Sequence, residues 1–142
     1  MRIFFAGPLT DLVNPDQTKA FYKKMAEVAQ ANGFDYYWAF MRGTDPELNP
    51  EVLPARVFQI DTYELEESDV MIAYVGEPSV GTGEEIEYAR EHRIPAYLMF
   101  EKGKHISRML LGTPNVKGTI EFTDEADALS QLAALLKTLQ TK

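Results

Sequence analysis

The chain has 142 residues, 45% of them hydrophobic, and its 22 acidic and 14 basic side chains give a formal net charge of −8. This length and apolar content predict one globular domain over residues 1–142. The negative charge argues against a nucleic-acid polymer or an anionic membrane as partner, because both would repel the protein. The absence of cysteine excludes disulfides, thiolate metal sites and a cysteine nucleophile.

The first residues already have the apolar pattern of a strand, without the features of a signal peptide, and no apolar run is long enough to span a bilayer. We therefore expect a cytoplasmic protein. The two histidines, His92 and His105, lie too far apart in sequence to suggest a metal cluster. We expect neither a metal nor a cofactor at the functional site.

Strand-like and helix-like segments alternate along most of the chain. Short apolar or aromatic runs predict strands over residues 3–6, 34–40, 70–75, 94–100 and 116–122. Apolar side chains at helical spacing predict helices over residues 18–31, 55–68, from Gly83 to about Arg93, and 124–139. The segment from Met41 to Pro54 is rich in proline and is expected to be a loop long enough to be functional.

This alternation predicts an α/β fold with a parallel sheet covered on both faces. Right-handed crossovers between five strands favour a flavodoxin-like three-layer sandwich with strand order 2-1-3-4-5, whose switch point lies between the first and third strands. Two loops meet there, Gly7-Pro8-Leu9 and Ser79 to Gly83. A small-molecule site is therefore expected at this crevice.

The Gly-rich segment from Ser79 to Gly83 follows the third strand and precedes a helix. Its glycines permit positive φ angles and close approach of a ligand, and a helix N-terminus there offers free N–H groups to an anion. The segment is not a phosphate-binding P-loop, since no Lys-Ser or Lys-Thr follows, and it lacks the third glycine of a dinucleotide fingerprint. Cofactor binding is thus disfavoured.

Carboxylates are the chemical groups that the site can offer. Glu84 and Glu85 lie at the helix start, and Asp61 falls on the apolar stripe of the preceding helix, with Glu64 nearby. Carboxylates acting without metal or histidine suit the cleavage of glycosidic bonds. The simpler alternative is an acidic helix start and a solvated helix face, although a carboxylate on an apolar stripe needs a polar partner.

Three motifs together resemble the nucleoside 2-deoxyribosyltransferase superfamily over nearly the full chain. They are Ile3-Phe4-Phe5-Ala6-Gly7-Pro8-Leu9, the spacing of Asp61 from Ser68-Asp69-Val70, and the block from Gly81 to Ala89. The resemblance implies that Glu85 attacks C1′ of the sugar to form a glycosyl-enzyme, and that Asp61 orients the sugar and assists proton transfer. It also implies that the nucleoside lies against the loops at Gly7-Pro8 and Gly81-Thr82-Gly83.

Within that superfamily the chain is most similar to the nucleotide N-hydrolases, namely the Rcl-type deoxynucleoside monophosphate hydrolases and the MilB-type cytidylate hydrolases. Ser79 and Ser107 stand where these hydrolases bind the 5′-phosphate, and the segment from Ser107 to Gly112, which includes Met109, also resembles theirs. Two positions depart from the pattern. Thr10 replaces a phosphate-binding arginine, which leaves Arg42 among the candidate cations. Phe4 replaces a tyrosine that contacts the catalytic glutamate, as in the cytidylate hydrolases.

The resemblance thus implies an enzyme that cleaves the N-glycosidic bond of ribo- or deoxyribonucleoside 5′-monophosphates, forming a homodimer or higher oligomer with Ser107 acting across the interface. A nucleoside 2-deoxyribosyltransferase that exchanges bases between deoxynucleosides remains an alternative, because of Thr10. A non-catalytic nucleotide-binding module is an alternative of another class, since a fold does not fix a function. Aromatic residues from Tyr37 to Phe40 could stack on a base, but the core is their more common place.

Overall fold

The computed structural model describes residues 1–141, and its centre is a five-stranded sheet of order β2-β1-β3-β4-β5. All four neighbouring pairs are parallel. The strands are β1 (Arg2–Ala6), β2 (Asp35–Trp38), β3 (Val70–Tyr74), β4 (Ala96–Glu101) and β5 (Val116–Phe122). The expected α/β fold and strand order are confirmed.

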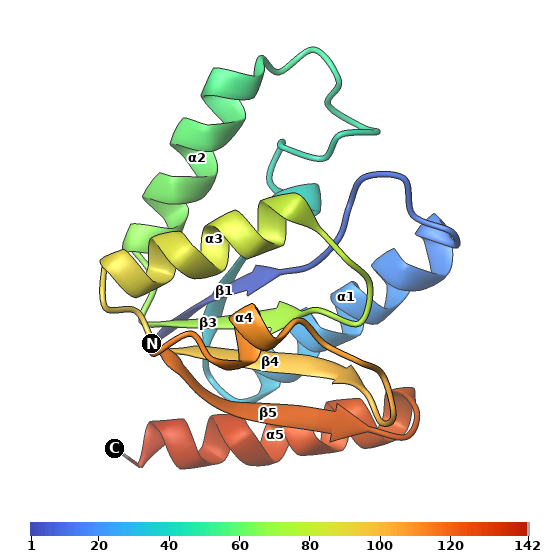
Figure 1. The fold of residues 1–142 in the computed structure, drawn as a ribbon, viewed down its shortest axis with the longest axis vertical. Helices are drawn as coiled ribbons and strands as arrows, with labels where there is room; N and C mark the ends of the chain where they lie inside the picture. The colour runs from blue at the N-terminus through green and yellow to red at the C-terminus, as the bar shows by residue number, and fades with distance from the viewer. Residues whose placement is uncertain (142) are drawn as a thin grey trace.

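Helices cover both faces of the sheet (Figure 1). They are α1 (Pro15–Ala31), α2 (Pro54–Glu66), α3 (Val80–Glu91), α4 (Arg108–Leu111) and α5 (Glu125–Gln140). Buried side chains of α1 and α5 share one apolar cluster, whereas those of α2 and α3 share the other. Among residues 1–141, no helix combines the length and apolar character needed to cross a membrane.

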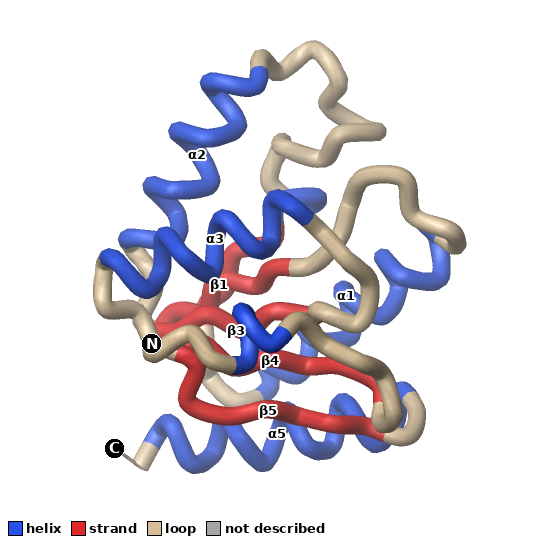
Figure 2. The backbone as a smooth tube through the Cα atoms, in the orientation of Figure 1, coloured by secondary structure: helices blue, strands red, loops and turns tan. Residues whose placement is uncertain are grey.

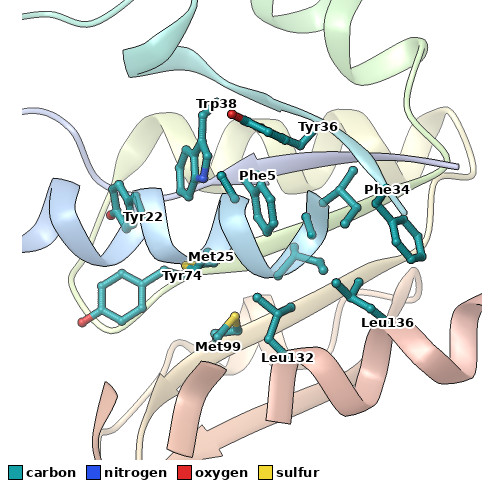
Figure 3. Close-up of a cluster of buried hydrophobic side chains, with 14 of the residues drawn as sticks. Phe5, Tyr22, Met25, Phe34, Tyr36, Trp38, Tyr74, Met99, Leu132 and Leu136 are labelled. Atoms are coloured by element: carbon teal, nitrogen blue, oxygen red, sulfur yellow. The ribbon is translucent and has the colours of Figure 1, made fainter. Parts of the chain in front are cut away.

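The alternation of side chains along β1 divides the core in two. Ile3 and Phe5 face the α1 and α5 layer, whereas Phe4 and Ala6 face the α2 and α3 layer. Phe5 stacks on Trp38 with ring centroids 5.3 Å apart (Figure 3). The side chains of β1 therefore alternate between the two layers with a two-residue period, and both sets are buried.

Local structure differs from expectation at three places. The aromatic segment 34–40 leaves the strand after Trp38, because Ala39–Met41 forms a 3₁₀ turn. Helix α3 begins at Val80, with Ser79 as its N-cap, so Gly81 and Gly83 lie inside its first turns. Neither glycine has a positive φ, so the conformational freedom that glycine permits is not used at these two positions. The short helix α4 was not expected from the sequence.

Two long connections extend from the same end of the sheet (Figure 2). They are residues 7–14, between β1 and α1, and residues 42–53, before α2. Since all strands are parallel, this end holds their carboxyl termini, and α3 also starts there. The topology therefore places the expected loops around one crevice.

Candidate active site

A cavity of about 580 Å³ lies at this crevice. Its walls come from the loop after β1, the segment 44–54, one side of α2 and the beginning of α3. The polar side chains of the wall are those of Thr10, Thr44, Asn49, Asp61, Thr62, Ser79, Thr82, Glu84, Glu85, and the hydroxyl-bearing Tyr88. Apolar residues of segment 44–54 and of α2 line the remainder, so the cavity offers both an apolar and a carboxylate-bearing region.

Asp61 enters the cavity from α2 and is anchored on one oxygen. The hydroxyls of Tyr37 and Thr44 donate to its Oδ1 over 2.8 Å and 3.1 Å. Burial raises the pKa of Asp61, and the two hydroxyl donors oppose that rise. The polar partner that a carboxylate on an apolar stripe requires is thus a pair of buried hydroxyls.

Glu85 reaches the cavity from α3, one helical turn after Thr82, whose own hydroxyl is buried without a hydrogen-bond partner. Burial raises the pKa of Glu85 well above its ordinary value, and the neighbouring charges of Asp61 and Glu84 raise it further. Burial and the two neighbouring carboxylates therefore favour the protonated form of Glu85. Two carboxyl groups in one cavity with different hydrogen-bond environments are the arrangement that acid, base and nucleophile roles require.

The N-terminus of α3 also opens into the cavity. Ser79 Oγ accepts a hydrogen bond from the Thr82 N–H over 3.2 Å, which leaves the hydroxyl proton of Ser79 free to be donated. The first turn of α3 holds no acidic residue, because the helix starts at Val80 and Glu84 falls in the second turn. The interpretation of this segment as an acidic helix start is therefore wrong, and the positive end of the helix remains available to an anion.

Gly7 forms part of the cavity wall for a packing reason. A Cβ atom at this position would lie 2.5 Å from the Tyr22 hydroxyl oxygen, which is too close for any side chain. Tyr22 itself donates to the Pro8 carbonyl over 3.0 Å and so fixes the course of the loop. Gly7 thus brings the backbone of this loop to the edge of the cavity.

Several expected site residues do not line this cavity. Phe4 is fully buried beneath it, and Pro8 and Gly83 lie outside its wall. Arg42 donates to the Tyr36 carbonyl and lies over the Tyr36 ring instead. Ser107 and Met109 border a separate, small hollow with Arg108. In a single chain, the structure therefore brings together Asp61, Glu85, Gly7, Ser79 and Gly81, but not the remaining candidates.

An ion pair braces the loop that forms one wall of the cavity. Lys19 Nζ of α1 lies 2.7 Å from a carboxylate oxygen of Asp45, whose side chain is fully buried. The other oxygen of Asp45 accepts the N–H groups of Glu47 and Leu48. The contact with Lys19 ties the turn at residues 45–48 to α1, and the two N–H contacts hold the turn itself.

The hydrogen bonds of Tyr37 and Thr44 to Asp61 are the contacts of the cavity that the sequence did not identify. The two-residue strand period does place Tyr37 on the face opposite Tyr36 and Trp38. The contact with Asp61, however, joins residues 24 positions apart, and no local pattern records it. Over residues 1–141, no group of three or more potential ligand side chains is arranged to hold a metal ion.

No family model matches the chain. Several relatives carry the name "Putative 2'-deoxynucleoside 5'-phosphate N-hydrolase 1". The one from Syntrophotalea carbinolica is 34% identical over 85 residues, which cover 58% of this chain and 56% of the relative. The one from Thermofilum pendens is 26% identical over 139 residues, or 96% of this chain and 95% of the relative. The chain thus matches just over half the length of the first relative and nearly all of the second.

Two solved structures share the fold. The CMP N-glycosidase BcmB of Clostridium botulinum has a TM-score of 0.74 at 22% identity, covering 95% of this chain and 99% of that chain. A 2-deoxyribosyltransferase of Bacillus psychrosaccharolyticus has a TM-score of 0.68 at 19% identity, covering 93% and 96%. The resemblance to the nucleoside 2-deoxyribosyltransferase superfamily is confirmed. The cavity that holds Asp61 and Glu85 is the candidate active site.

Proposed function

We propose that this protein is an N-glycosidase that cleaves nucleoside 5′-monophosphates to a free base and a sugar 5-phosphate. The observation that carries the proposal is the pairing of Asp61 and Glu85 in one cavity. The names of the two relatives support the substrate class. A cavity of about 580 Å³ is large enough for a nucleotide.

In the proposed reaction, a carboxylate oxygen of Glu85 attacks C1′ of the sugar as the bond from C1′ to the base nitrogen breaks. The departing base takes up a proton from Asp61, which also orients the sugar. Water then adds to C1′, Asp61 takes up the proton that the water loses, and the bond from C1′ to Glu85 breaks. Because burial favours the protonated form of Glu85, Glu85 must lose its proton before it attacks, and the carboxylate of Asp61 in the same cavity can receive that proton.

The phosphate belongs, in this proposal, at the N-terminus of α3. Ser79 can donate its hydroxyl proton there, and the uncompensated helix end supplies N–H groups and a favourable dipole. Gly81 meets no atom within 4 Å of its missing Cβ, so a ligand can approach the backbone closely. These groups would bind the phosphate without the arginine that Thr10 replaces.

A 2-deoxyribosyltransferase acting on unphosphorylated nucleosides is the second candidate. The specific observation in its favour is that no lysine, arginine or histidine among the described residues lines the cavity, since a phosphate dianion usually pairs with arginine or lysine. In that reaction, a second base would replace water at C1′. The two reactions share the proposed roles of Glu85 and Asp61.

A chromatographic assay of released base separates these candidates. The substrates would be ribo- and deoxyribonucleoside 5′-monophosphates and the matching nucleosides, each incubated with and without a free acceptor base. Release from the monophosphates without acceptor supports the hydrolase. Base exchange that requires the acceptor supports a transferase instead. Binding of a nucleotide without turnover of any substrate supports a non-catalytic nucleotide-binding module.

A further inference from the structure

Asp61 makes all of its hydrogen bonds, within residues 1–141, through one oxygen. Tyr37 and Thr44 both donate to Oδ1, and their hydroxyl oxygens lie 3.3 Å from each other. Both donors are buried, with exposed fractions of 1% for Tyr37 and 5% for Thr44. A carboxylate oxygen that accepts two hydroxyl protons has little capacity left for a ligand.

The two donors are held by parts of the fold other than the helix that carries Asp61. Tyr37 belongs to β2, and its ring stacks on the fully buried Phe4 with centroids 5.3 Å apart. Thr44 follows the 3₁₀ turn, and its hydroxyl also lies 3.4 Å from the Ala39 carbonyl. Burial raises the pKa of Tyr37, so its hydroxyl stays protonated at neutral pH and acts as a donor. The position of Asp61 is thus set by the sheet rather than by α2 alone.

The second oxygen, Oδ2, is free for another partner. Asp61 lines the cavity, and Oδ2 is not one of the polar atoms that are both buried and unpaired. It therefore contacts the solvent-filled cavity. An oxygen in this position can accept a sugar hydroxyl or hold the proton that the departing base requires.

We propose that Tyr37 and Thr44 are positioning residues that hold Oδ1 of Asp61 and so turn Oδ2 toward the sugar. The inference rests on the proposed function, since it assigns the purpose of the anchored carboxylate. It also predicts which carboxyl group carries the charge. Two hydroxyl donors stabilise the ionised form of Asp61, whereas Glu85 receives no hydrogen bond from any described residue.

Three other carboxyl groups lie around Asp61, and each affects its ionisation or shares its cavity. Glu64 on α2 disfavours its ionisation but is itself paired with Arg2. Glu84 and Glu85 approach from α3, and both line the same cavity. Removal of a hydroxyl donor should therefore raise the pKa of Asp61, and the loss of its charge should in turn lower the pKa of Glu85.

The main test compares Tyr37→Phe with Tyr36→Phe. Tyr36 is the neighbouring buried tyrosine on the opposite face of the sheet, and its hydroxyl makes no hydrogen bond with described residues. We expect Tyr37→Phe to lower kcat by about ten- to a hundredfold, with a much smaller change in KM, because a hydrogen bond to a charged group is lost. The Tyr36→Phe variant should retain the kcat of the wild type. Equal kcat values for Tyr37→Phe and the wild type would overturn the inference.

A second pair of variants tests the same point at Thr44. Thr44→Val removes the hydroxyl with little change in shape, whereas Thr44→Ser retains it. The inference expects Thr44→Val to lower kcat and Thr44→Ser to restore most of it. If both variants have the same kcat, the side chain acts through packing and the inference is wrong for Thr44.

A titration of the protein without substrate tests the inference by a measurement that does not depend on turnover. Carbon-13 NMR of labelled aspartate carboxyls would follow Asp61, assigned with an Asp61→Asn variant, in the wild type and in Tyr37→Phe. The pKa of Asp61 should be higher in Tyr37→Phe and unchanged in Tyr36→Phe. An unchanged pKa in all proteins would reject the positioning role even if nucleotides are cleaved. A raised pKa in a protein that cleaves no nucleotide would instead reject the proposed function alone.

Discussion

The two carboxyl groups of the cavity differ in their surroundings although they differ little in chemistry. Asp61 receives two hydroxyl protons, whereas Glu85 receives none from residues 1–141 and lies near the charges of Asp61 and Glu84. Burial raises the pKa of both groups, but the two hydroxyl donors oppose that rise at Asp61, whereas no hydrogen bond opposes it at Glu85. We expect these environments to divide the roles of the two residues in any reaction at this site.

The proposed nucleophile can be tested by a single substitution. Glu85→Ala should lower turnover at least about a thousandfold, because the group that attacks C1′ is removed. Glu87→Gln is a suitable control, since Glu87 lies on the exposed side of the same helix and pairs with Arg90. Base release would be measured for both variants, and circular dichroism would check the fold. Substantial activity in Glu85→Ala would exclude the covalent mechanism.

The same residue should affect stability in a pH-dependent manner. The pKa of Glu85 is higher in the folded protein than the ordinary value of 4.5, so the folded state binds its proton more tightly than the unfolded chain. The resulting stability is present below pH 4.5 and is lost as the pH rises toward the folded pKa. Because glutamine does not ionise, a Glu85→Gln variant should not lose stability in this way as the pH rises. It should be more stable than the wild type at neutral pH, with the difference vanishing near pH 4.

Thermal or urea unfolding of both proteins at several pH values would measure this difference. A gain in stability on removal of a functional group is the usual sign of a site that trades stability for activity. Equal unfolding free energies at every pH would mean that Glu85 is ionised in the folded protein at no cost. The raised pKa would then be contradicted.

At the scale of elements, the segment 44–53 forms a wall of the cavity without regular secondary structure. Such a segment needs specific contacts to keep one conformation. The buried Asp45 provides them through Lys19 and through two backbone N–H groups. The shape of the cavity therefore depends on an ion pair that lies outside its wall.

Asp45→Ala should destabilise the protein by about 3 kcal/mol, since it breaks a buried ion pair and removes a turn acceptor. We also expect a higher KM, because the loop would lose its fixed conformation. Glu125→Ala breaks a comparable but exposed pair with Lys24 and should cost less than about 1 kcal/mol. Unfolding curves and steady-state kinetics would compare the two variants. Similar effects of both would show that Asp45 has no special role in the loop.

At the scale of the molecule, the position of Ser107 raises the question of assembly. Ser107 and Met109 lie outside the cavity of their own chain, and the side chain of Met109 is 84% exposed. Exposed apolar side chains in this region suit contact with another protein surface. We propose that the protein forms a homodimer or higher oligomer in which Ser107 completes the site of the partner.

Mixing two inactive variants tests this arrangement. If Ser107 acts across the interface, Ser107→Ala and Glu85→Ala should each have low activity, and mixed dimers should contain one intact site. Random exchange of subunits would then restore roughly a quarter of the wild-type activity. Sedimentation would establish the oligomeric state. A fully active monomer, or a mixture without regained activity, would contradict the shared site.

Local periodicity determined most of the fold. Apolar strand-like runs alternate with helical patterns along the sequence, so the strand order and the crevice between Gly7 and Ser79 could be predicted from the sequence. Asp61 and Glu85 could be selected because carboxylates at those positions matched a family pattern. The start of α3 was not predicted correctly. Two glycines usually indicate a loop, but the hydroxyl of Ser79 caps the helix, so that the helix begins before both glycines.

Tertiary structure alone decided how the site is supported. The hydrogen bond from Tyr37 to Asp61 joins residues 24 positions apart, and the contact of Lys19 with Asp45 joins α1 to a distant loop. Such contacts depend on how the sheet and the helices pack, which no repeat in the sequence records. The sequence therefore determined which chemical groups the protein can use. The packing of β2, α2 and the loop between them determined how one of these groups is held.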